Sequence, residues 1–228
     1  MRAPLILHYA PDNASLCVRL ALEELGLPHE TRLVDRRAQG QKTPRYLALN
    51  PNGLIPVLET PEGPLYETGA ILLWLADRHP GRAFPAPDAE GRGPALTRLI
   101  WLANTLHPAL RMLFYPEQYQ PADPGMLRRA TQLRLTGLLD LLAARMSACL
   151  VTDRPDVVAC YLAPMLRWCA LYGGDTTWFD LGRWPGLLAF ARAFEARAAA
   201  MRAAAAEGLG PTPFSAPILP TPPEGSAT

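Results

Sequence analysis

The stretch LNPNGLIPVLETPEGPLYETGAILLWLADRH, from Leu49 to His79, contains the residues that decide how this chain folds. The apolar run 54–58 predicts a short strand, and residues 65–66 can pair antiparallel with it across the intervening Pro-Glu-Gly-Pro turn. Apolar residues at helical spacing then predict a helix over 68–78. Pro56 is unusual within a strand, because proline lacks the N–H that a sheet ladder needs and is confined to strand edges or first positions.

The residues that precede this stretch predict a βαβ unit. Residues 5–8 are a short apolar run that ends in a turn, and apolar positions over 15–25 recur at helical spacing before Gly26 supplies a stop. Residues 29–34 alternate like a second strand. A strand, a helix and a strand in about 30 residues make the two strands parallel. With a short helix around 46–48, the expected order of the first 80 residues is βαβ-α-ββα.

The residues that follow predict a second, all-helical domain. Prolines and glycines crowd the segment 81–94, which we interpret as a linker after a first domain of residues 1–80. The second domain, 95–207, shows only helical patterns, at 95–115, 126–148, 156–172 and 185–205. Residues 208–228 are rich in proline, and we expect this tail to be extended or disordered. The fold class is therefore α/β followed by all-α.

The composition narrows the classes of function. Of 228 residues, 49% are apolar and 19% charged, as in an ordered globular protein. The 22 basic and 21 acidic residues give a net charge of +1, which predicts neither nucleic acid nor a membrane surface as a partner. The four cysteines form no CxxC and no metal-ligand spacing, so we expect no metal and a reducing compartment. Without an apparent secretory signal or a membrane-spanning segment, the sequence predicts a cytoplasmic location.

Three segments carry a resemblance to a known family. NPNGLIPVLE and YETGAILLWLAD, at these places in a mixed α/β half followed by a helical half, resemble the glutathione transferase superfamily. RPDVVACYLAPMLRW (154–168) is similar to the segment that opens the central helix of that family's second domain, and WLANTLHPAL (101–110) resembles the substrate-site helix of bacterial members related to the beta class. The resemblance implies a thioredoxin-like first domain, a cytoplasmic homodimer and a role in detoxification, with glutathione as co-substrate and no cofactor.

The resemblance also implies a glutathione-binding set. The proline at the place of Pro56 is cis in the family, which would turn the main chain of Ile55 outward so that a small peptide docks like an added strand. Glu67 and Thr68 lie where a strand ends and a helix begins, so they would hold the γ-glutamyl end of glutathione. Lys42 or Arg45 would reach the glycyl carboxylate. An ordinary edge-strand proline, plain helix capping and a solvated surface charge are the respective alternatives.

The residue that activates the thiol is the open point. In an alignment without gaps the beta-class cysteine falls on Ala14, which can neither donate a hydrogen bond nor form a mixed disulfide. Ser15 at the helix start, Asn13 in the turn and Tyr9 at the strand end remain, in that order, although Ser15 is also a credible N-cap and Asn13 a credible turn residue. Cys17 lacks a partner cysteine, and we expect it in the core.

The second domain supplies candidates for the electrophile pocket. His107 matches a histidine that beta-class members present to the active site, where it can donate a hydrogen bond or move a proton close to neutral pH. Leu110, Phe114 and Tyr115 would line an apolar pocket, although aromatic residues at helical spacing are usually core. Asp156 is expected to cap the helix that follows it.

The sequence therefore predicts a glutathione S-transferase that uses the glutathione thiolate against a small hydrophobic electrophile. Two alternatives stay open. One is a binding or regulatory protein of the same fold without turnover, which the alanine at position 14 favours. The other is a glutathione-dependent isomerase, peroxidase or dehalogenase, since these reactions use the same thiolate. The identity of the electrophile is not encoded in any of these patterns.

Overall fold

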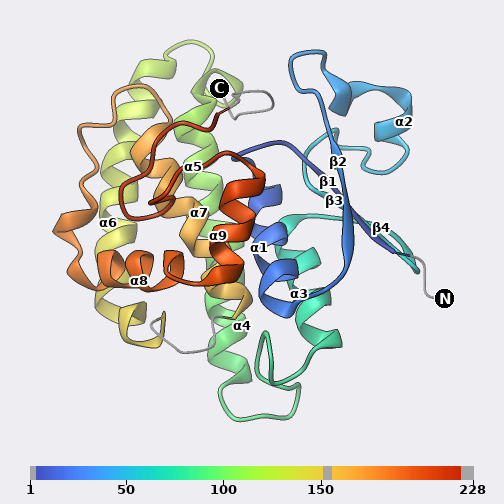
Figure 1. Cartoon of the computed structure of the whole chain (residues 1–228). Helices are drawn as coiled ribbons and strands as arrows, with labels where there is room; N and C mark the ends of the chain where they lie inside the picture. The colour runs from blue at the N-terminus through green and yellow to red at the C-terminus, as the bar shows by residue number, and fades with distance from the viewer. Residues whose placement is uncertain (1–3, 151–155, 222–228) are drawn as a thin grey trace.

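A computed structural model describes residues 4–150 and 156–221 (Figure 1). The N-terminal part is a four-stranded sheet in the order β2-β1-β3-β4, in which β1 and β2 are parallel and the other pairs antiparallel. Its elements are β1 Leu5–Tyr9, α1 Ser15–Leu25, β2 His29–Leu33, α2 Pro44–Leu47, β3 Val57–Thr60, β4 Gly63–Tyr66 and α3 Thr68–Arg78. The predicted βαβ-α-ββα order and the fold class are confirmed.

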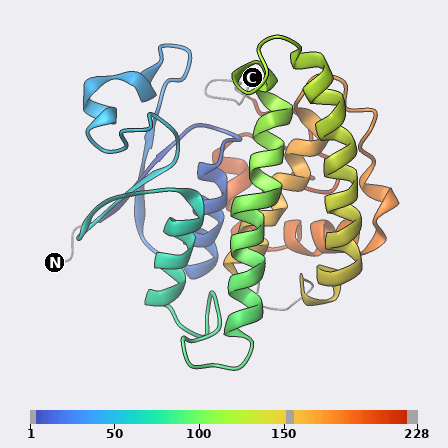
Figure 2. The same cartoon turned by 180° about the vertical axis from the view of Figure 1, so that it is seen from behind.

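The two faces of the sheet are covered unequally. On one face α1 and α3 pack against the sheet, and the inward residues Leu7 and Leu58, which pair across β1 and β3, lie in the main core with no exposed surface. On the other face a smaller cluster of Val34, Tyr46 and Val57 is covered by α2. Helices α1 and α3 lie between the sheet and the helical part (Figure 2).

The remainder of the described chain is helical. Its longer elements are α4 Arg92–Trp101, α5 His107–Phe114, α6 Pro124–Leu150, α7 Val157–Leu171, α8 Pro185–Glu195 and α9 Ala198–Ala206. A π-helical segment, Leu102–Leu106, joins α4 to α5 ahead of Pro108, whose missing N–H prevents a regular α-helical ladder at that point. Helix α7 is the centre of this part, because Val157–Cys169 are all buried. None of the helices described is long and apolar enough to cross a membrane.

The C-terminal region differs in two respects from what the sequence pattern indicated. The pattern over 185–205 predicted a single helix, but the chain breaks between α8 and α9, where the backbone of Arg197 is extended. The break allows α9 to pack on α1, while Arg197 binds Glu24 with nitrogen–oxygen distances of 2.8 and 2.9 Å. Of the two expectations for the tail, disorder does not hold for 208–221. The backbone there forms no helix or strand, but it folds back onto the helices and buries Leu209 and Phe214. Residues 222–228 lie outside the described part.

Candidate functional site

A cavity of about 590 Å³ lies between the sheet domain and the helical part. Three segments of the N-terminal part line it: the turn at Asn13 and Ala14, residues 54–56, and the start of α3 at 67–70. From the helical part come residues of α4, α5 and α7. The cavity therefore brings together residues far apart in sequence, several of which the sequence analysis had selected.

The peptide bond between Ile55 and Pro56 is cis, which confirms that prediction. Leu54, which precedes it, is fixed through its carbonyl oxygen, which accepts hydrogen bonds from the Tyr46 hydroxyl (2.9 Å) and the Asn50 amide (2.8 Å). Ile55 precedes β3, and its main-chain N–H and C=O have no hydrogen-bond partner among the residues the structure describes. Those two groups are therefore available at the wall of the cavity.

Glu67 and Thr68 lie side by side where β4 meets α3. Glu67 has φ of 70°, a conformation that few residues other than glycine adopt, and its side chain makes no capping hydrogen bond. Thr68 is the first residue of α3, largely buried, and it lines the cavity. The capping alternative for these two residues is thus not what the structure shows. A carboxylate, a hydroxyl and the N-terminus of an 11-residue helix meet at one wall.

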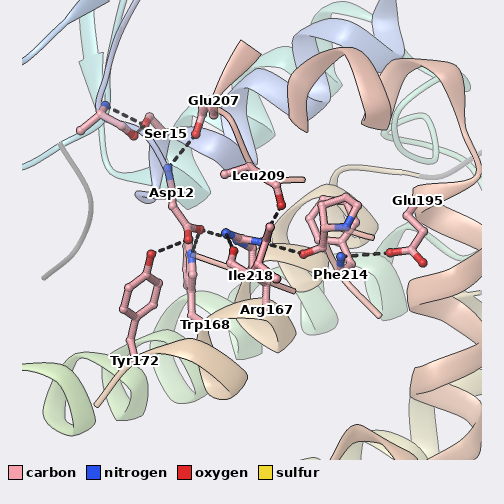
Figure 3. Close-up of polar contacts among 12 residues, drawn as sticks. Asp12, Ser15, Arg167, Trp168, Tyr172, Glu195, Glu207, Leu209, Phe214 and Ile218 are labelled. Atoms are coloured by element: carbon pink, nitrogen blue, oxygen red, sulfur yellow. Dashed lines mark hydrogen bonds and ion pairs between the residues drawn. The ribbon is translucent and has the colours of Figure 1, made fainter. Parts of the chain in front are cut away.

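Ser15 does not reach the cavity, which corrects the candidate ranked first as the thiol activator. Its side chain is fully buried, and its hydroxyl donates to the Ala10 carbonyl at 3.1 Å and accepts from the Ala10 N–H at 3.3 Å (Figure 3). Tyr9 is also outside the cavity lining, and the Arg19 guanidinium lies 4.4 Å from the centroid of its ring. Both hydrogen bonds of the Ser15 hydroxyl are therefore made to the main chain of Ala10, within the turn.

Asn13 is the candidate that the structure places at the cavity. Its side-chain oxygen accepts a hydrogen bond of 2.9 Å from the N–H of Ala14, so the amide group has a fixed orientation and its NH₂ end is not used in that contact. Ala14, at the place of the beta-class cysteine, lines the cavity beside it. Cys17 lies in the core with no exposed surface, as expected, and burial raises the pKa of its thiol well above the usual range.

His107 lines the cavity between two aromatic residues of α7. Its Nδ1 shares a hydrogen bond of 2.9 Å with the Tyr161 hydroxyl, and its ring centroid lies 5.7 Å from that of Trp168. Burial and, secondly, the charge of Arg111 lower the pKa of His107 to about 4. A pKa near 4 leaves the imidazole neutral at pH 7, which favours the hydrogen-bonding role of His107 over proton transfer near neutral pH.

The other pocket candidates divide between the cavity and the core. Phe114 and Tyr115 line the cavity, and the Tyr115 hydroxyl accepts a hydrogen bond of 3.1 Å from Arg36. Leu110 has no exposed surface and belongs to the core, so the pocket assignment is corrected for this residue. Lys42 is exposed and lies over Gly53, where an added Cβ would stand 2.9 Å from its Nζ, but it is not part of the lining.

Sequence reasoning missed several residues of the lining, notably Asn50, Arg111, Tyr161 and Trp168. Tyr161 and Trp168 were read only as part of a helix, and they are seven residues apart, hence on one face of α7. This spacing indicates that the two side chains share one face of the helix. It does not indicate a binding site, because the same spacing is found in any buried helix. Arg111 follows His107 by one turn on α5 and carries the same signal.

Comparison with known proteins gives a consistent result. Residues 14–78 match the family described as glutathione S-transferase, N-terminal domain. Glutathione S-transferase GST-4.5 of Xanthomonas campestris is 30% identical over 209 residues, which are 89% of this chain and 98% of that protein. Maleylpyruvate isomerase of a Ralstonia species is 26% identical over 73% of this chain and 82% of that protein. A sphingomonad glutathione S-transferase solved with glutathione has a TM-score of 0.76 and 31% identity over 90% of this chain and all of that one.

Proposed function

This chain belongs to the glutathione S-transferase family, and we propose that its cavity binds glutathione and presents the thiolate to a small hydrophobic electrophile. The observation that carries the proposal is that one cavity joins Asn13, Ile55 and the Glu67–Thr68 pair. These residues supply, in turn, a donor for sulfur, an unpaired stretch of main chain and an anchor for a charged end.

Glutathione is held along the N-terminal wall. The N–H and C=O of Ile55 pair with the main chain of the cysteinyl part, as a strand pairs with a sheet edge. The Thr68 hydroxyl and the N-terminus of α3 receive the γ-glutamyl carboxylate, because unpaired N–H groups and the helix dipole favour an anion there. The Glu67 carboxylate receives the ammonium group of the same γ-glutamyl end.

Asn13 stabilises the thiolate. With its oxygen occupied by the Ala14 N–H, the side-chain NH₂ donates to sulfur. A hydrogen bond to the charged form lowers the pKa of a thiol, which is otherwise about 8.5 and leaves most of it protonated at pH 7. The thiol proton goes to solvent, and the sulfur lone pair forms the new bond to the electrophilic carbon.

The electrophile lies against the helical wall of Phe114, Tyr115 and the neutral His107. Aromatic faces favour an apolar, planar substrate. A neutral imidazole beside the reacting atoms does not offer a positive charge, but it can still donate or accept a hydrogen bond.

A second candidate is a glutathione-dependent isomerase. Arg111 lines the cavity one turn after His107 and forms no ion pair with a carboxylate among the described residues. A guanidinium in that position favours a substrate that carries a carboxylate. The similarity to a maleylpyruvate isomerase agrees with this candidate.

The pKa of the bound glutathione thiol tests the proposal. We expect ultraviolet absorbance of the thiolate, followed against pH, to give a pKa at least about one unit below the free value near 8.5. Asn13→Ala should raise that pKa by about one unit, because a hydrogen bond to a charged group contributes about 1.5 kcal/mol.

Asn52→Ala is the matched control, since Asn52 is exposed and outside the cavity lining. A bound thiol that titrates as in free glutathione contradicts the proposal. An Asn13→Ala protein that keeps the wild-type thiol pKa removes Asn13 from the role.

A further inference from the structure

Asp12, directly before Asn13, is a fully buried acid held by three side chains of the helical part. Its carboxylate accepts hydrogen bonds from Arg167 Nε (2.8 Å), Trp168 Nε1 (2.8 Å) and the Tyr172 hydroxyl (2.5 Å), as Figure 3 shows. Its main-chain N–H donates to Glu207 Oε2 at 2.8 Å. The turn that carries Asn13 is therefore fixed from outside its own domain.

Arg167 also binds the C-terminal segment, which we define as residues 208–221. Its two terminal nitrogens donate to the carbonyl oxygens of Pro213 at 3.1 Å and Ile218 at 2.7 Å, with a longer contact of 3.5 Å to Leu209 (Figure 3). The guanidinium has no exposed surface. One rigid planar group thus joins Asp12 to three points of the C-terminal segment.

The C-terminal segment is itself anchored to the helices. Glu195 of α8 accepts hydrogen bonds from the N–H groups of Phe214 (3.0 Å) and Ser215 (2.9 Å). The N–H of Thr221 donates to the Gly208 carbonyl at 2.9 Å, which closes the segment on itself. The carbonyls that receive Arg167 are therefore held in place independently of Asp12.

Asp12 does not line the cavity, but it is linked to two residues that do. Asn13, its neighbour in sequence, is one lining residue, and Trp168, which donates to its carboxylate, is another. The Tyr172 ring, also tied to Asp12, lies 6.0 Å from the ring of Phe114 in the lining. A displacement of this carboxylate would move residues on both walls.

We propose that Arg167 is a positioning residue of the transferase site, which ties the C-terminal segment to Asp12 and so sets where Asn13 and Trp168 lie in the cavity. The inference rests on the proposed function through the role of Asn13 at sulfur. A buried ion pair is weak evidence for a stability role alone, because well-packed apolar residues serve folding equally well. The Asp12 carboxylate can hold the thiol-activating turn through three hydrogen bonds, which an apolar side chain at this position could not form.

Two variants test this inference, and each breaks a different contact. In a chain that ends at Ser215, Arg167 loses the Ile218 carbonyl, while the core residues Leu209 and Phe214 remain. Arg167→Lys keeps the positive charge next to Asp12, but a single ammonium group lacks the fork that reaches Asp12 and the carbonyls together. A chain that ends at Thr221 keeps every contact described above and is the matched control.

The readouts are the pKa of the bound glutathione thiol, kcat with a chlorinated aromatic compound as the test electrophile, and amide hydrogen exchange. In both variants we expect the thiol pKa to rise by about one unit and kcat to fall about tenfold, because small misplacements of a catalytic donor are costly. Amide exchange should rise in the peptide that covers residues 10–16, which is distant from the cut in sequence but linked to it through Arg167. Exchange in β3 and β4 should stay unchanged.

Each result decides the inference. A lowered melting temperature with unchanged thiol pKa and kcat overturns it and leaves Arg167 a merely structural residue. Unchanged exchange at residues 10–16 overturns the mechanical link. If the wild-type protein itself leaves the thiol pKa of glutathione at its free value, the proposed function fails, and the exchange measurement still decides whether the C-terminal segment holds the Asp12 turn.

Discussion

Asn13 and Ser15 are two residues apart, yet their side chains lie in different surroundings. Asn13 lines the cavity, whereas Ser15 is sealed in the turn by its two hydrogen bonds to Ala10. In a helical turn each residue changes the side-chain direction by about 100°, so two residues that are two positions apart point to nearly opposite sides. The sequence selected this segment but did not determine which of its polar side chains lines the cavity.

Ser15→Ala is predicted to affect stability and not the thiol. The substitution leaves the buried N–H and C=O of Ala10 without their partner, which costs about 1–3 kcal/mol of unfolding free energy. Urea unfolding measures this loss, and ultraviolet titration of bound glutathione should give the wild-type thiol pKa. A raised thiol pKa in this variant would restore Ser15 as the activator.

The lowered pKa of His107 leads us to expect a loss of stability in mild acid. Burial, aided by Arg111, lowers its pKa from 6.5 to about 4 in the folded protein. Between these values the unfolded chain binds the proton and the folded one does not, so stability falls as the pH drops from 6.5 toward 4. Thermal unfolding from pH 7 to pH 4.5 should show a shallower loss for His107→Gln than for the wild type. Equal slopes would show that His107 titrates normally.

At the scale of elements, periodicity and breakers predicted most of the fold. The strands and helices around Pro56 follow from alternation, helical spacing and stop residues within each segment, which are local causes. The break at Arg197 has no such local cause, since neither glycine nor proline is present there. Contacts of α9 with α1 and the pairing of Arg197 with Glu24 decide it, and both depend on residues more than 170 positions away.

The start of α7 gives a prediction at this scale. Asp156 Oδ1 accepts hydrogen bonds from the N–H groups of Val158 (2.9 Å) and Ala159 (3.0 Å), as the sequence predicted for its capping role. Asp156→Ala should lower the unfolding free energy by about 1–2 kcal/mol, and Asp156→Asn by less, because asparagine is also a good cap. Denaturant unfolding measures both variants. Equal stability of Asp156→Ala and the wild type would contradict the capping role.

At the scale of the molecule, the cavity forms only where the sheet domain packs against the helical part. Residues 54–56 and 67–68 of the cavity wall were selected because they lie within one continuous stretch, 49–79. Asp12, Trp168 and Arg167 make their contacts only when two parts of the chain meet. The burial of part of the C-terminal segment was missed for the same reason. Its prolines exclude helix and strand, but carbonyl groups need no regular structure to bind a buried guanidinium. The homodimer implied by the resemblance stays a prediction.

Isothermal titration of glutathione into the whole protein tests the central claim most directly. We predict heat of binding with one site per chain, and an affinity about tenfold lower for Thr68→Val, which removes one hydrogen bond to the γ-glutamyl carboxylate. Thr97→Val, on α4 and outside the cavity lining, should bind like the wild type. An absence of heat at millimolar glutathione, or a Thr68→Val protein with wild-type affinity, would contradict the proposed site.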